Sequence, residues 1–573
     1  MGRTDKFDAV VIGSGFGGSV AAWRLKQDCP DASILVLERG MPYPPRSFPR
    51  TPRELRANFW DPSSALYGLF EVWRFEHLKA VVSSGLGGGS LIYANVMLEK
   101  PPNTFAADAP NRRRAWPIGH EQLASRYPQI KALLDPKPLP DVYRTAGPAG
   151  TTSVPKTDQF IAAARAAGLS DARPAQLAVA FAAPHGDPEP GAPLGAENLH
   201  KRARRTCTLV GECDLGCNEG AKNSLDYTYL SEFKQGGGEI RTCAQAVGIT
   251  PLARGEPGYT VRYLQHLHAR ARVEARGAAD GKLDSDRELL DPCTDAVREV
   301  TATIVVLAAG TFGSTRLLAQ NRAVLAPLSD QLGRGFSSNG DLLTVARDCS
   351  SPGRSQRELA PSRGPVITAY ASGEGLWMED AGGPLLSEWA WQLPELAGDM
   401  WAMRRDLPAL MSGKARGSIG AKLARMLGSA RSSSAMLPML TMGRDVPGGR
   451  IRLDGDSLAL DWDPDGASQG YFTHARRTAS DVARELGGRL GPRWLLRHGP
   501  GITVHPLGGC SLGSDPDEGV VTPTGEVFGC PGLYVADGSV MPGPVGPNPS
   551  LTIAAIADVI AAAAARALNG TSA

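Results

Sequence analysis

The stretch FDAVVIGSGFGGSVAAWRL, residues 7–25, decides the fold. Residues 7–12 form an apolar run, which predicts a parallel strand buried on both faces. Gly13, Gly15 and Gly18 follow in the G-x-G-x-x-G spacing, and a helical segment comes next. These glycines permit a tight turn, close approach of a pyrophosphate and close packing of helix on strand. The helix N-terminus would offer free N–H groups to the phosphates.

A second predicted strand, SILVLERG (residues 33–40), contains the acid that completes this pattern. Glu38 stands twenty positions after Gly18, where an acid binds the ribose hydroxyls of an adenine nucleotide. An acid there disfavours a 2′-phosphate, so FAD or NAD is expected rather than NADP. The alternative is a chance glycine-rich turn, which the strand before, the helix after and the acid argue against.

The bulk composition limits the class of protein. With 573 residues the chain is too long for one ordinary core, and 42% hydrophobic with 21% charged residues fits a soluble globular protein. A net charge of +2 gives no general attraction to nucleic acid. Nine scattered cysteines argue against a disulfide framework and favour a reducing, cytoplasmic location. No signal peptide is apparent, and the apolar residues 551–568 contain Asp558 and Arg566, so we expect a buried helix rather than a membrane span.

Three further stretches favour FAD among the dinucleotides. SSGLGGGSLIYANVM (83–97) is a glycine run that lets backbone N–H groups press against a flat ring or a phosphate. ATIVVLAAGTFGSTRLL (302–318) predicts a buried strand, a turn and a helix. GLYVADGSVMPGPVGPNPSLTIAAIADVI (532–560) predicts a strand, a Pro/Gly loop and a long helix. These segments are far apart in sequence but could converge on one extended cofactor.

Together with HPLGGC (505–510), these stretches resemble the glucose–methanol–choline (GMC) family of FAD oxidoreductases, and in particular its cholesterol oxidase-like branch. CNEGAKNSLDYTYL (217–230) and MGRDVPGGRIRLD (442–454) carry the same resemblance. It implies an α/β fold: a Rossmann-like FAD-binding domain with a mixed α+β substrate-binding cap built on an antiparallel sheet. We expect the FAD domain to be discontinuous, at 1–100, 200–345 and 500–573, and the substrate cap to comprise 101–199 and 346–499.

The resemblance also implies which residues hold FAD. Those expected near the adenosine diphosphate part or the flavin are Gly13, Gly15, Gly18, Glu38, Gly87, Gly88, Gly89, Ser90, Asn95, Val247, Gly310, Asp537, Gly538, Asn548, Pro549 and Thr552. One position departs from the family pattern. Many members place Asn directly after the GGGSL-x run, where this chain has Tyr93, with Asn95 two residues later. Local flavin contacts and oxygen access are therefore open at this point.

Alcohol oxidation sends a hydride to flavin N5 and requires that the hydroxyl proton leave, which a neutral His can accept. The resemblance assigns this polar pair to His505 and Asn548. Taken alone, His505 could start a tight turn, and Asn548 could simply cap a helix with Pro549 at its first position. Glu379, in LWMEDAGGP, is a candidate for moving a steroid double bond after oxidation; the alternative is a solvated acidic turn with Asp380.

Two other segments leave alternatives open. Cys207, Cys213 and Cys217 have C-x5-C-x3-C spacing, which matches no common zinc or iron–sulfur pattern, so plain thiols in a glycine-rich turn are expected and no metal. The alternatives are a metal site with Cys243 as a distant fourth ligand, and transient disulfide formation. Residues 400–442 are basic and rich in Met. They could form a lid, a peripheral membrane contact or an ordinary cap helix.

The sequence thus predicts an FAD-dependent oxidase or dehydrogenase for a hydrophobic alcohol, with a 3-hydroxysteroid as the expected substrate and O2 or another electron acceptor. Long-chain, terpenoid or polyketide alcohols are alternatives within the same chemistry. A non-redox flavoprotein such as an isomerase, or a protein that binds FAD only structurally, is the alternative from another class. No nucleic-acid partner is expected.

Overall fold

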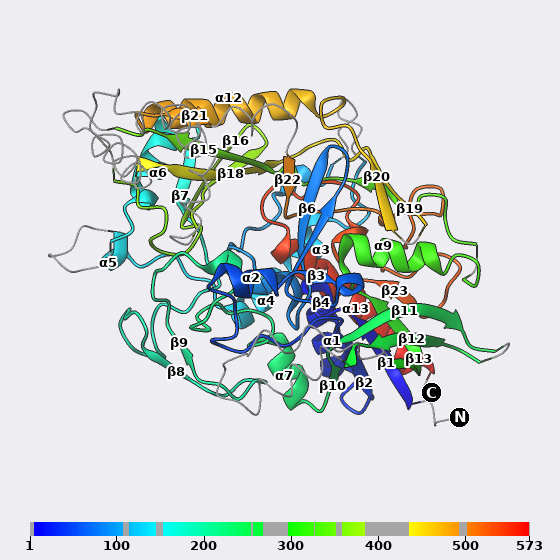
Figure 1. Ribbon diagram of the computed structural model, residues 1–573. Helices are drawn as coiled ribbons and strands as arrows, with labels where there is room; N and C mark the ends of the chain where they lie inside the picture. Colours follow the sequence, from blue (N-terminus) through cyan, green and yellow to red (C-terminus); the bar gives the residue numbers. More distant parts are fainter. Residues whose placement is uncertain are drawn as a thin grey trace, which may run out of the picture.

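The computed structural model describes residues 5–106, 114–144, 153–253, 256–267, 296–325, 327–350, 358–383, 435–455, 457–491 and 501–571. Two large sheets organise these residues. In Figure 1 the strands labelled β1, β2 and β10–β13 lie in the lower part of the view, and β15, β16 and β18 lie in the upper part.

The first sheet has seven strands in the order β10–β2–β1–β13–β12–β11, with β23 also paired to β13. Pairs within β10, β2, β1, β13 and β23 are parallel, whereas β11, β12 and β13 are joined antiparallel. The bounds are β1 (Asp5–Ile12), β2 (Ile34–Leu37), β10 (Glu239–Arg241), β11 (Ala244–Pro251), β12 (Tyr259–Gln265), β13 (Ala296–Leu307) and β23 (Leu533–Val535). Residues 9–12 and 34–37 are buried, as an apolar strand in the middle of a parallel sheet must be.

Helices α1 (Phe16–Asp28) and α13 (Ser550–Thr571) pack against each other and against this sheet. By length and composition α13 could cross a membrane, but 78% of its most apolar window is buried inside the protein. Ala554, Ile556 and Ile560 lie in the same hydrophobic core as β1 and β13. Within the described residues α13 therefore packs as a core helix, as its Asp558 and Arg566 suggest.

The second large sheet is antiparallel throughout, in the order β21–β15–β18–β17–β16–β7. Its bounds are β7 (Asp171–Pro174), β15 (Leu342–Arg347), β16 (Ala369–Gly373), β17 (Leu376–Asp380), β18 (Leu437–Gly443) and β21 (Arg489–Gly491). Helices α6 (Lys156–Ala166) and α12 (Gln469–Glu485) pack on it and share a core of Leu, Ala and Met side chains with its strands. Figure 1 shows α12 running across the top of this layer.

A small three-stranded sheet fixes the backbone just before the loop that carries His505. β22 (Gly501–Thr503) pairs in parallel with β6 (Leu78–Ser83), which pairs antiparallel with β5 (Phe70–Arg74). Because β22 ends at Thr503, this pairing fixes the backbone two residues before His505.

The remaining elements are short. The other strands are β3 (Trp60–Asp61) with β4 (Leu66–Tyr67), β8 (Pro193–Gly195) with β9 (Arg204–Arg205), and the sheet of β14 (Arg334–Phe336), β19 (Gly449–Asp454) and β20 (Ser457–Asp461). The other α-helices in the described part of the chain are α2 (Pro52–Arg56), α3 (His120–Ala124), α4 (Tyr127–Leu134), α5 (Asp141–Arg144), α7 (Tyr229–Gln235) and α9 (Gly310–Gln320). Three 3-10 turns border the site: η2 (Gly88–Leu91), η5 (Cys213–Leu215) and η7 (Gly538–Val540).

Segments far apart in sequence share each sheet: residues 5–37, 239–307 and 533–535 in the first, and 171–174, 342–380, 437–443 and 489–491 in the second. The predicted boundary between residues 345 and 346 falls inside β15. The division into domains stays a prediction. Most of the Met-rich stretch, residues 400–434, lies outside the described residues, and residues 437–442 belong to β18.

Candidate active site

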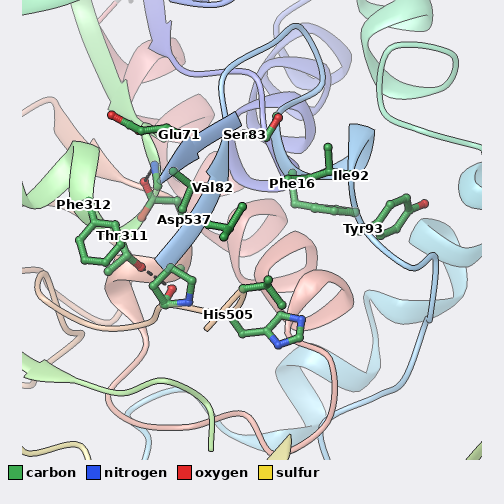
Figure 2. Close-up of a pocket in the computed structure, with 18 of the residues that line it drawn as sticks. Phe16, Glu71, Val82, Ser83, Ile92, Tyr93, Thr311, Phe312, His505 and Asp537 are labelled. Carbon is green, nitrogen blue, oxygen red and sulfur yellow. Dashed lines mark hydrogen bonds between the residues drawn. The ribbon is translucent and has the colours of Figure 1, made fainter. Parts of the chain in front are cut away.

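A cavity of about 790 Å³ is lined by residues from both large sheets. The first sheet and its loops contribute Gly13, Glu38, Val247 and Gly310, and the second contributes Leu343 and Leu440. Figure 2 shows His505, Tyr93, Phe312 and Asp537 around this space. A pocket of this size and mixed lining is typical of a small-molecule or cofactor site.

The glycine loop between β1 and α1 forms one wall. Gly13 has φ +101°, and a Cβ there would stand 2.2 Å from the carbonyl oxygen of Ala308 in the loop after β13. A Cβ on Gly18 would stand 2.0 Å from the carbonyl oxygen of Gly13, so α1 packs directly on the turn. Gly15 precedes the first residue of α1 and lines the cavity. The N-terminus of α1 therefore opens onto the cavity, which is the arrangement that binds phosphates.

Glu38 holds this loop in place at the end of β2. Its Oε2 accepts hydrogen bonds from the Ser14 backbone N–H (3.1 Å) and the Ser14 hydroxyl (2.6 Å), and Oε1 accepts from the Gly40 N–H (2.8 Å). Burial raises the pKa of this carboxyl, while the hydrogen bonds from Ser14 and Gly40 oppose the shift. Glu38 lines the cavity beside Val247, where the sequence places the adenosine end.

The turn at residues 87–90 packs against this glycine loop. Gly88 lies so close to the phosphate loop that its Cβ would stand 2.5 Å from the Gly15 Cα. Ser90 braces the turn, because its hydroxyl donates to the Gly87 carbonyl (2.7 Å) and accepts from the Leu225 N–H (3.0 Å). Asn95 lines the cavity in a left-handed conformation, and neither polar atom of its buried amide has a hydrogen-bond partner among the described residues.

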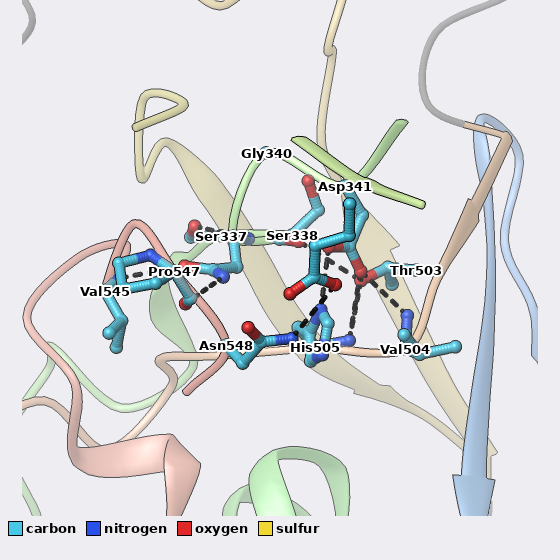
Figure 3. A network of polar contacts seen from close by, with 12 residues as sticks. Ser337, Ser338, Gly340, Asp341, Thr503, Val504, His505, Val545, Pro547 and Asn548 are labelled. Atoms are coloured by element: carbon cyan, nitrogen blue, oxygen red, sulfur yellow. Dashed lines mark hydrogen bonds and ion pairs between the residues drawn. The ribbon is translucent and has the colours of Figure 1, made fainter. Parts of the chain in front are cut away.

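His505 lines the cavity and is held by Asp341, at the start of β15. His505 Nδ1 donates to Asp341 Oδ1 at 2.8 Å, because a carboxylate can only accept (Figure 3). Asp341 Oδ2 accepts three further hydrogen bonds, from the Thr503 hydroxyl (2.8 Å), the Val504 N–H (2.9 Å) and the His505 N–H (3.2 Å). In neutral His505 this arrangement leaves Nε2 without a proton, as a hydrogen-bond acceptor.

Asn548 lines the same cavity and contacts Glu379, on β17. Asn548 Nδ2 donates to Glu379 Oε2 at 3.4 Å. Asn548 Oδ1 and Glu379 Oε1 are buried, and within the part of the chain that the structure describes they have no hydrogen-bond partner. Glu379 is 0% exposed, and burial raises the pKa of its carboxyl well above the usual range. Asp380 is also 0% exposed, so the alternative of a solvated acidic turn is wrong.

The sequence expectation for Asn548 as a helix cap is off by one residue. The Ile553 N–H donates to the Pro549 carbonyl (2.8 Å), and α13 begins at Ser550. Pro549 therefore occupies the cap position, and the Asn548 amide is engaged with Glu379 instead of the helix. Both Pro549 and Ser550 line the cavity, so the N-terminus of α13 faces it.

Comparisons with known proteins agree with this geometry. Residues 495–557 match the family model "GMC oxidoreductase", and residues 11–41 match "NAD(P)-binding Rossmann-like domain". A cholesterol oxidase of Mycobacterium tuberculosis is 27% identical over 96% of this chain and 90% of its own length. A paromamine 6′-oxidase of Streptomyces fradiae is 26% identical over 96% and 89%. The crystal structure of pyridoxine 4-oxidase from "Mesorbium loti" superposes with a TM-score of 0.56 over 97% of this chain and 99% of that one, at 16% identity, and so speaks for the fold.

This chain is a GMC oxidoreductase. It belongs to the cholesterol oxidase-like branch, and the predicted family, fold class and FAD cofactor are confirmed. It is an enzyme that oxidises an alcohol at a CH–OH group.

The cavity of this GMC oxidoreductase fits FAD. It is continuous from Glu38 and Val247, past the glycine loop, to His505 and Asn548, so one extended cofactor can span it. At Gly89 and Gly310 nothing lies within 4 Å of the position a Cβ would take, although both line the cavity. The unpartnered buried amide of Asn95 offers a donor and an acceptor to a polar ring edge.

Of the predicted site residues, one group lines the cavity and another stands behind it. The cavity is lined by Gly13, Gly15, Glu38, Gly88, Gly89, Asn95, Val247, Gly310, His505, Asp537, Gly538, Asn548 and Pro549. Gly18, Gly87, Ser90, Thr552 and Glu379 are not part of this lining. The specific contacts assigned to each residue stay predictions.

Asp537 has a structural task besides lining the cavity. Its Oδ2 accepts from the Gly310 N–H (2.8 Å) and the Ser314 hydroxyl (2.5 Å), and its Oδ1 accepts from the N–H (2.8 Å) and hydroxyl (2.5 Å) of Ser539. One carboxylate thus joins the start of α9 to η7, holding together two loops that border the cofactor cavity.

Sequence reasoning missed Asp341 and Asp214, which both line the cavity. Asp341 stands 164 positions before His505, and no local spacing connects them. Asp214 lies in the cysteine segment, where the spacing of the thiols is the visible pattern and a single acid belongs to none.

Cys207, Cys213 and Cys217 lie in this segment without a disulfide bond. Burial raises the pKa of both Cys207 and Cys213, which makes thiolates unfavourable. The sulfur of Cys207 accepts from the Leu209 N–H, and that of Cys217 accepts from the Ala221 N–H. Within the described residues, no group of three or more His, Cys, Asp or Glu side chains gathers as metal ligands would.

Proposed function

We propose that this enzyme oxidises a hydrophobic secondary alcohol, with a 3-hydroxysteroid as the first candidate, to the ketone. The observation that carries the proposal is the His505–Asp341 pair beside Asn548, at the end of the FAD cavity bounded by the antiparallel sheet. Apolar side chains such as Leu343, Val366 and Leu440 line that end. Burying such surface against a steroid or a long hydrocarbon is favourable.

FAD, when bound, supplies the acceptor for the hydride from the carbinol carbon. His505 Nε2 accepts the hydroxyl proton, because Nδ1 already donates to Asp341. Asp341 keeps the ring in one tautomer and orientation and stabilises the imidazolium that forms. The carboxylate is 1% exposed and accepts four hydrogen bonds, so the ring has little freedom to turn away.

Asn548 orients the alcohol beside His505. Glu379 holds one end of the amide, and the other end has no partner in the described protein. A substrate hydroxyl can donate a hydrogen bond to this amide oxygen. Leaving a buried acceptor without a hydrogen bond costs about 1–3 kcal/mol. Glu379 reaches the cavity only through Asn548. We therefore propose that it positions the Asn548 amide, and that any shift of a steroid double bond needs another proton carrier.

Two narrower assignments rest on relatives and on composition. Oxygen is the proposed electron acceptor, because the relatives named above are oxidases. A reducing compartment is the proposed location, supported by cysteines that are odd in number and scattered along the chain. Peripheral membrane contact stays a prediction, since the Met-rich stretch on which it rests lies mostly outside the described residues.

The test is reduction of the FAD-loaded enzyme under anaerobic conditions. A panel should contain 3-hydroxysteroids, long-chain alcohols, terpenoid alcohols and paromamine, and bleaching of the flavin absorbance should be fastest with a steroid. Fast bleaching by another alcohol would retain the chemistry and replace the steroid. If none of these alcohols bleaches the flavin, alcohol oxidation is overturned in favour of a non-redox role. Admitting air after bleaching then separates an oxidase, which recovers its colour at once, from a dehydrogenase.

A further inference from the structure

Asp214 presents an unused carboxylate to the cavity. It lies in the short turn η5 and lines the cavity together with Val366, Ile367 and Ala381. More than a third of its surface is accessible, and no hydrogen bond or ion pair reaches its oxygens from the described part of the protein. An ionised group without hydrogen bonds against an apolar wall is unfavourable unless a ligand or water completes it.

Two buried lysines balance the charge of Asp214 without binding its oxygens. Lys222 Nζ donates all three of its hydrogens to backbone carbonyls, those of Leu91 (3.0 Å), Tyr93 (2.8 Å) and Cys213 (3.0 Å). Its ammonium group still stabilises the Asp214 anion electrostatically. The protein has thus compensated the charge of this carboxylate and left its acceptor positions open.

Lys156 also stabilises the Asp214 anion electrostatically, and it forms an ion pair with Asp380. Its ammonium donates to the carbonyls of Pro365 (3.1 Å) and Val366 (2.5 Å) and lies 3.9 Å from Asp380 Oδ2. Lys156 and Asp380 are both 0% exposed and form a neutral pair. Lys222 and Asp214 then form a second neutral combination, so the cluster as a whole has no net charge.

This balance selects the chemistry of the ligand. A substrate ammonium beside Asp214 would give the buried cluster a net positive charge, which is costly in a low-dielectric site. A neutral donor satisfies the carboxylate without that cost, and a hydrogen bond to a charged acceptor is about twice as strong as a neutral one. A hydroxyl group is the neutral donor that an alcohol substrate can carry in addition to the one that is oxidised.

We propose that Asp214 receives a second hydroxyl group of the substrate, so that this enzyme prefers hydrophobic diols over mono-alcohols of the same skeleton. The inference rests on the proposed alcohol oxidation and narrows its substrate class. Asp214 lies toward the reaction end of the cavity, because its segment is bonded at Gly211 to Gly364. The loop that follows Gly364 is bonded at Thr368 to Asp380, the neighbour of Glu379. The two hydroxyl groups therefore belong to one compact part of the substrate.

The ionisation of Asp214 gives a pH signature for this role. Surrounding protein atoms desolvate the carboxylate and raise its pKa to about 6, while Lys222 and Lys156 oppose the shift. The carboxylate is thus ionised at neutral pH and becomes protonated below pH 6. The preference for diols should weaken as the pH falls through that value.

The experiment compares matched pairs, each a 3-hydroxysteroid with and without a second hydroxyl on the same ring system. The measured quantity is the ratio of kcat/KM for diol and mono-alcohol. In the unaltered holoenzyme we expect at least one diol to exceed its mono-alcohol by about ten- to a hundredfold. Asp214→Val should abolish this ratio and improve use of the mono-alcohol, and Asp214→Asn should reduce the ratio and remove its pH dependence near 6.

Glu212→Gln is the matched control on the same turn. Glu212 pairs with Arg50 (2.7 Å) and does not line the cavity, so this variant should keep the diol ratio. A second readout needs no turnover: the flavin absorbance change on adding a steroid ketone or its hydroxylated counterpart gives both dissociation constants. Asp214→Val should weaken only the hydroxylated ligand.

The outcomes separate this inference from the proposed function. If mono-alcohols bleach the flavin but no diol is preferred, or if Asp214→Val leaves the ratio unchanged, the role of Asp214 is overturned and alcohol oxidation stands. If no alcohol bleaches the flavin but the hydroxylated ketone binds through Asp214, alcohol oxidation fails and the hydroxyl site stands. An Asp214-dependent preference for amino alcohols over diols would overturn the assignment of a neutral donor.

Discussion

Asp341 and Asp214 are two carboxylates on the wall of the same cavity, and they differ in exposure and in the number of hydrogen bonds that they accept. Asp341 is 1% exposed and accepts four hydrogen bonds, one of them from His505. Asp214 is accessible from the cavity and accepts none from the described residues, although Lys222 balances its charge. A carboxylate whose acceptor positions are all filled by hydrogen bonds fixes the catalytic loop. A carboxylate whose acceptor positions are open is available to a ligand.

The largest effect on the rate of flavin reduction should come from replacing His505, whose imidazole Asp341 holds. His505→Ala removes the proton acceptor, and we expect the rate of anaerobic flavin reduction to fall by about 10²–10⁴-fold. The visible spectrum should show that FAD is retained, because the glycine loop and Glu38 are untouched. His505→Gln, which keeps a polar side chain of similar length without a basic group, should be nearly as slow. Reduction within threefold of the unaltered enzyme would exclude His505 as the base.

Asp341→Asn should have a smaller effect, about ten- to a hundredfold, in the range found when a partner behind a catalytic ring is altered. The amide can donate to Nδ1, which would move the proton to Nε2 and block the acceptor. Loss of the carboxylate also removes a charge that stabilises the imidazolium formed during the reaction. If Asp341→Asn reduces its flavin within threefold of the unaltered rate, Asp341 is a loop support only.

The parts of the site that were predictable from sequence are those built by neighbours in the chain. Strand, glycine turn, helix and the acid at Glu38 lie within one 40-residue unit, and backbone conformation dictates their spacing. His505 and Asn548 were found through family resemblance, since a His-Pro turn or an Asn before a Pro is common loop chemistry. The antiparallel second sheet was likewise inferred from resemblance and not from strand periodicity.

Residues that act through tertiary contacts could not be predicted in this way. Asp341 precedes an ordinary apolar strand, and its role appears only once β15 and β22 bring it to His505. Asp214 depends on two lysines at positions 156 and 222 that are buried for reasons no local pattern records. The cap of α13 differed by one residue because Glu379, a residue of the other sheet, takes up the Asn548 amide.

Glu379 is a third carboxylate with an intermediate degree of satisfaction, and its effect should be the smallest. One oxygen accepts from Asn548, and the other has no partner among the residues described. Burial raises the pKa of this carboxyl well above the usual range. The folded state therefore holds a proton that the unfolded chain releases above about pH 4.3. Between about pH 4.3 and the raised pKa of Glu379, the folded form binds more protons than the unfolded chain. The free energy of unfolding therefore falls as the pH rises through this range.

Glu379→Gln removes this titration and keeps the shape and the hydrogen bond to Asn548. We expect the variant to be more stable than the unaltered holoenzyme by about 1–3 kcal/mol at neutral pH, with a gain that shrinks toward pH 4. Thermal unfolding of both proteins between pH 4 and 8 measures this difference. Glu197→Gln, at an exposed position just after β8, is the matched control and should follow the unaltered protein. A gain that stays constant with pH would mean that the Glu379 carboxyl does not titrate. A loss at every pH would mean that its proton is needed by a neighbour, which would place Glu379 with Asp341 among the carboxyls that build the site.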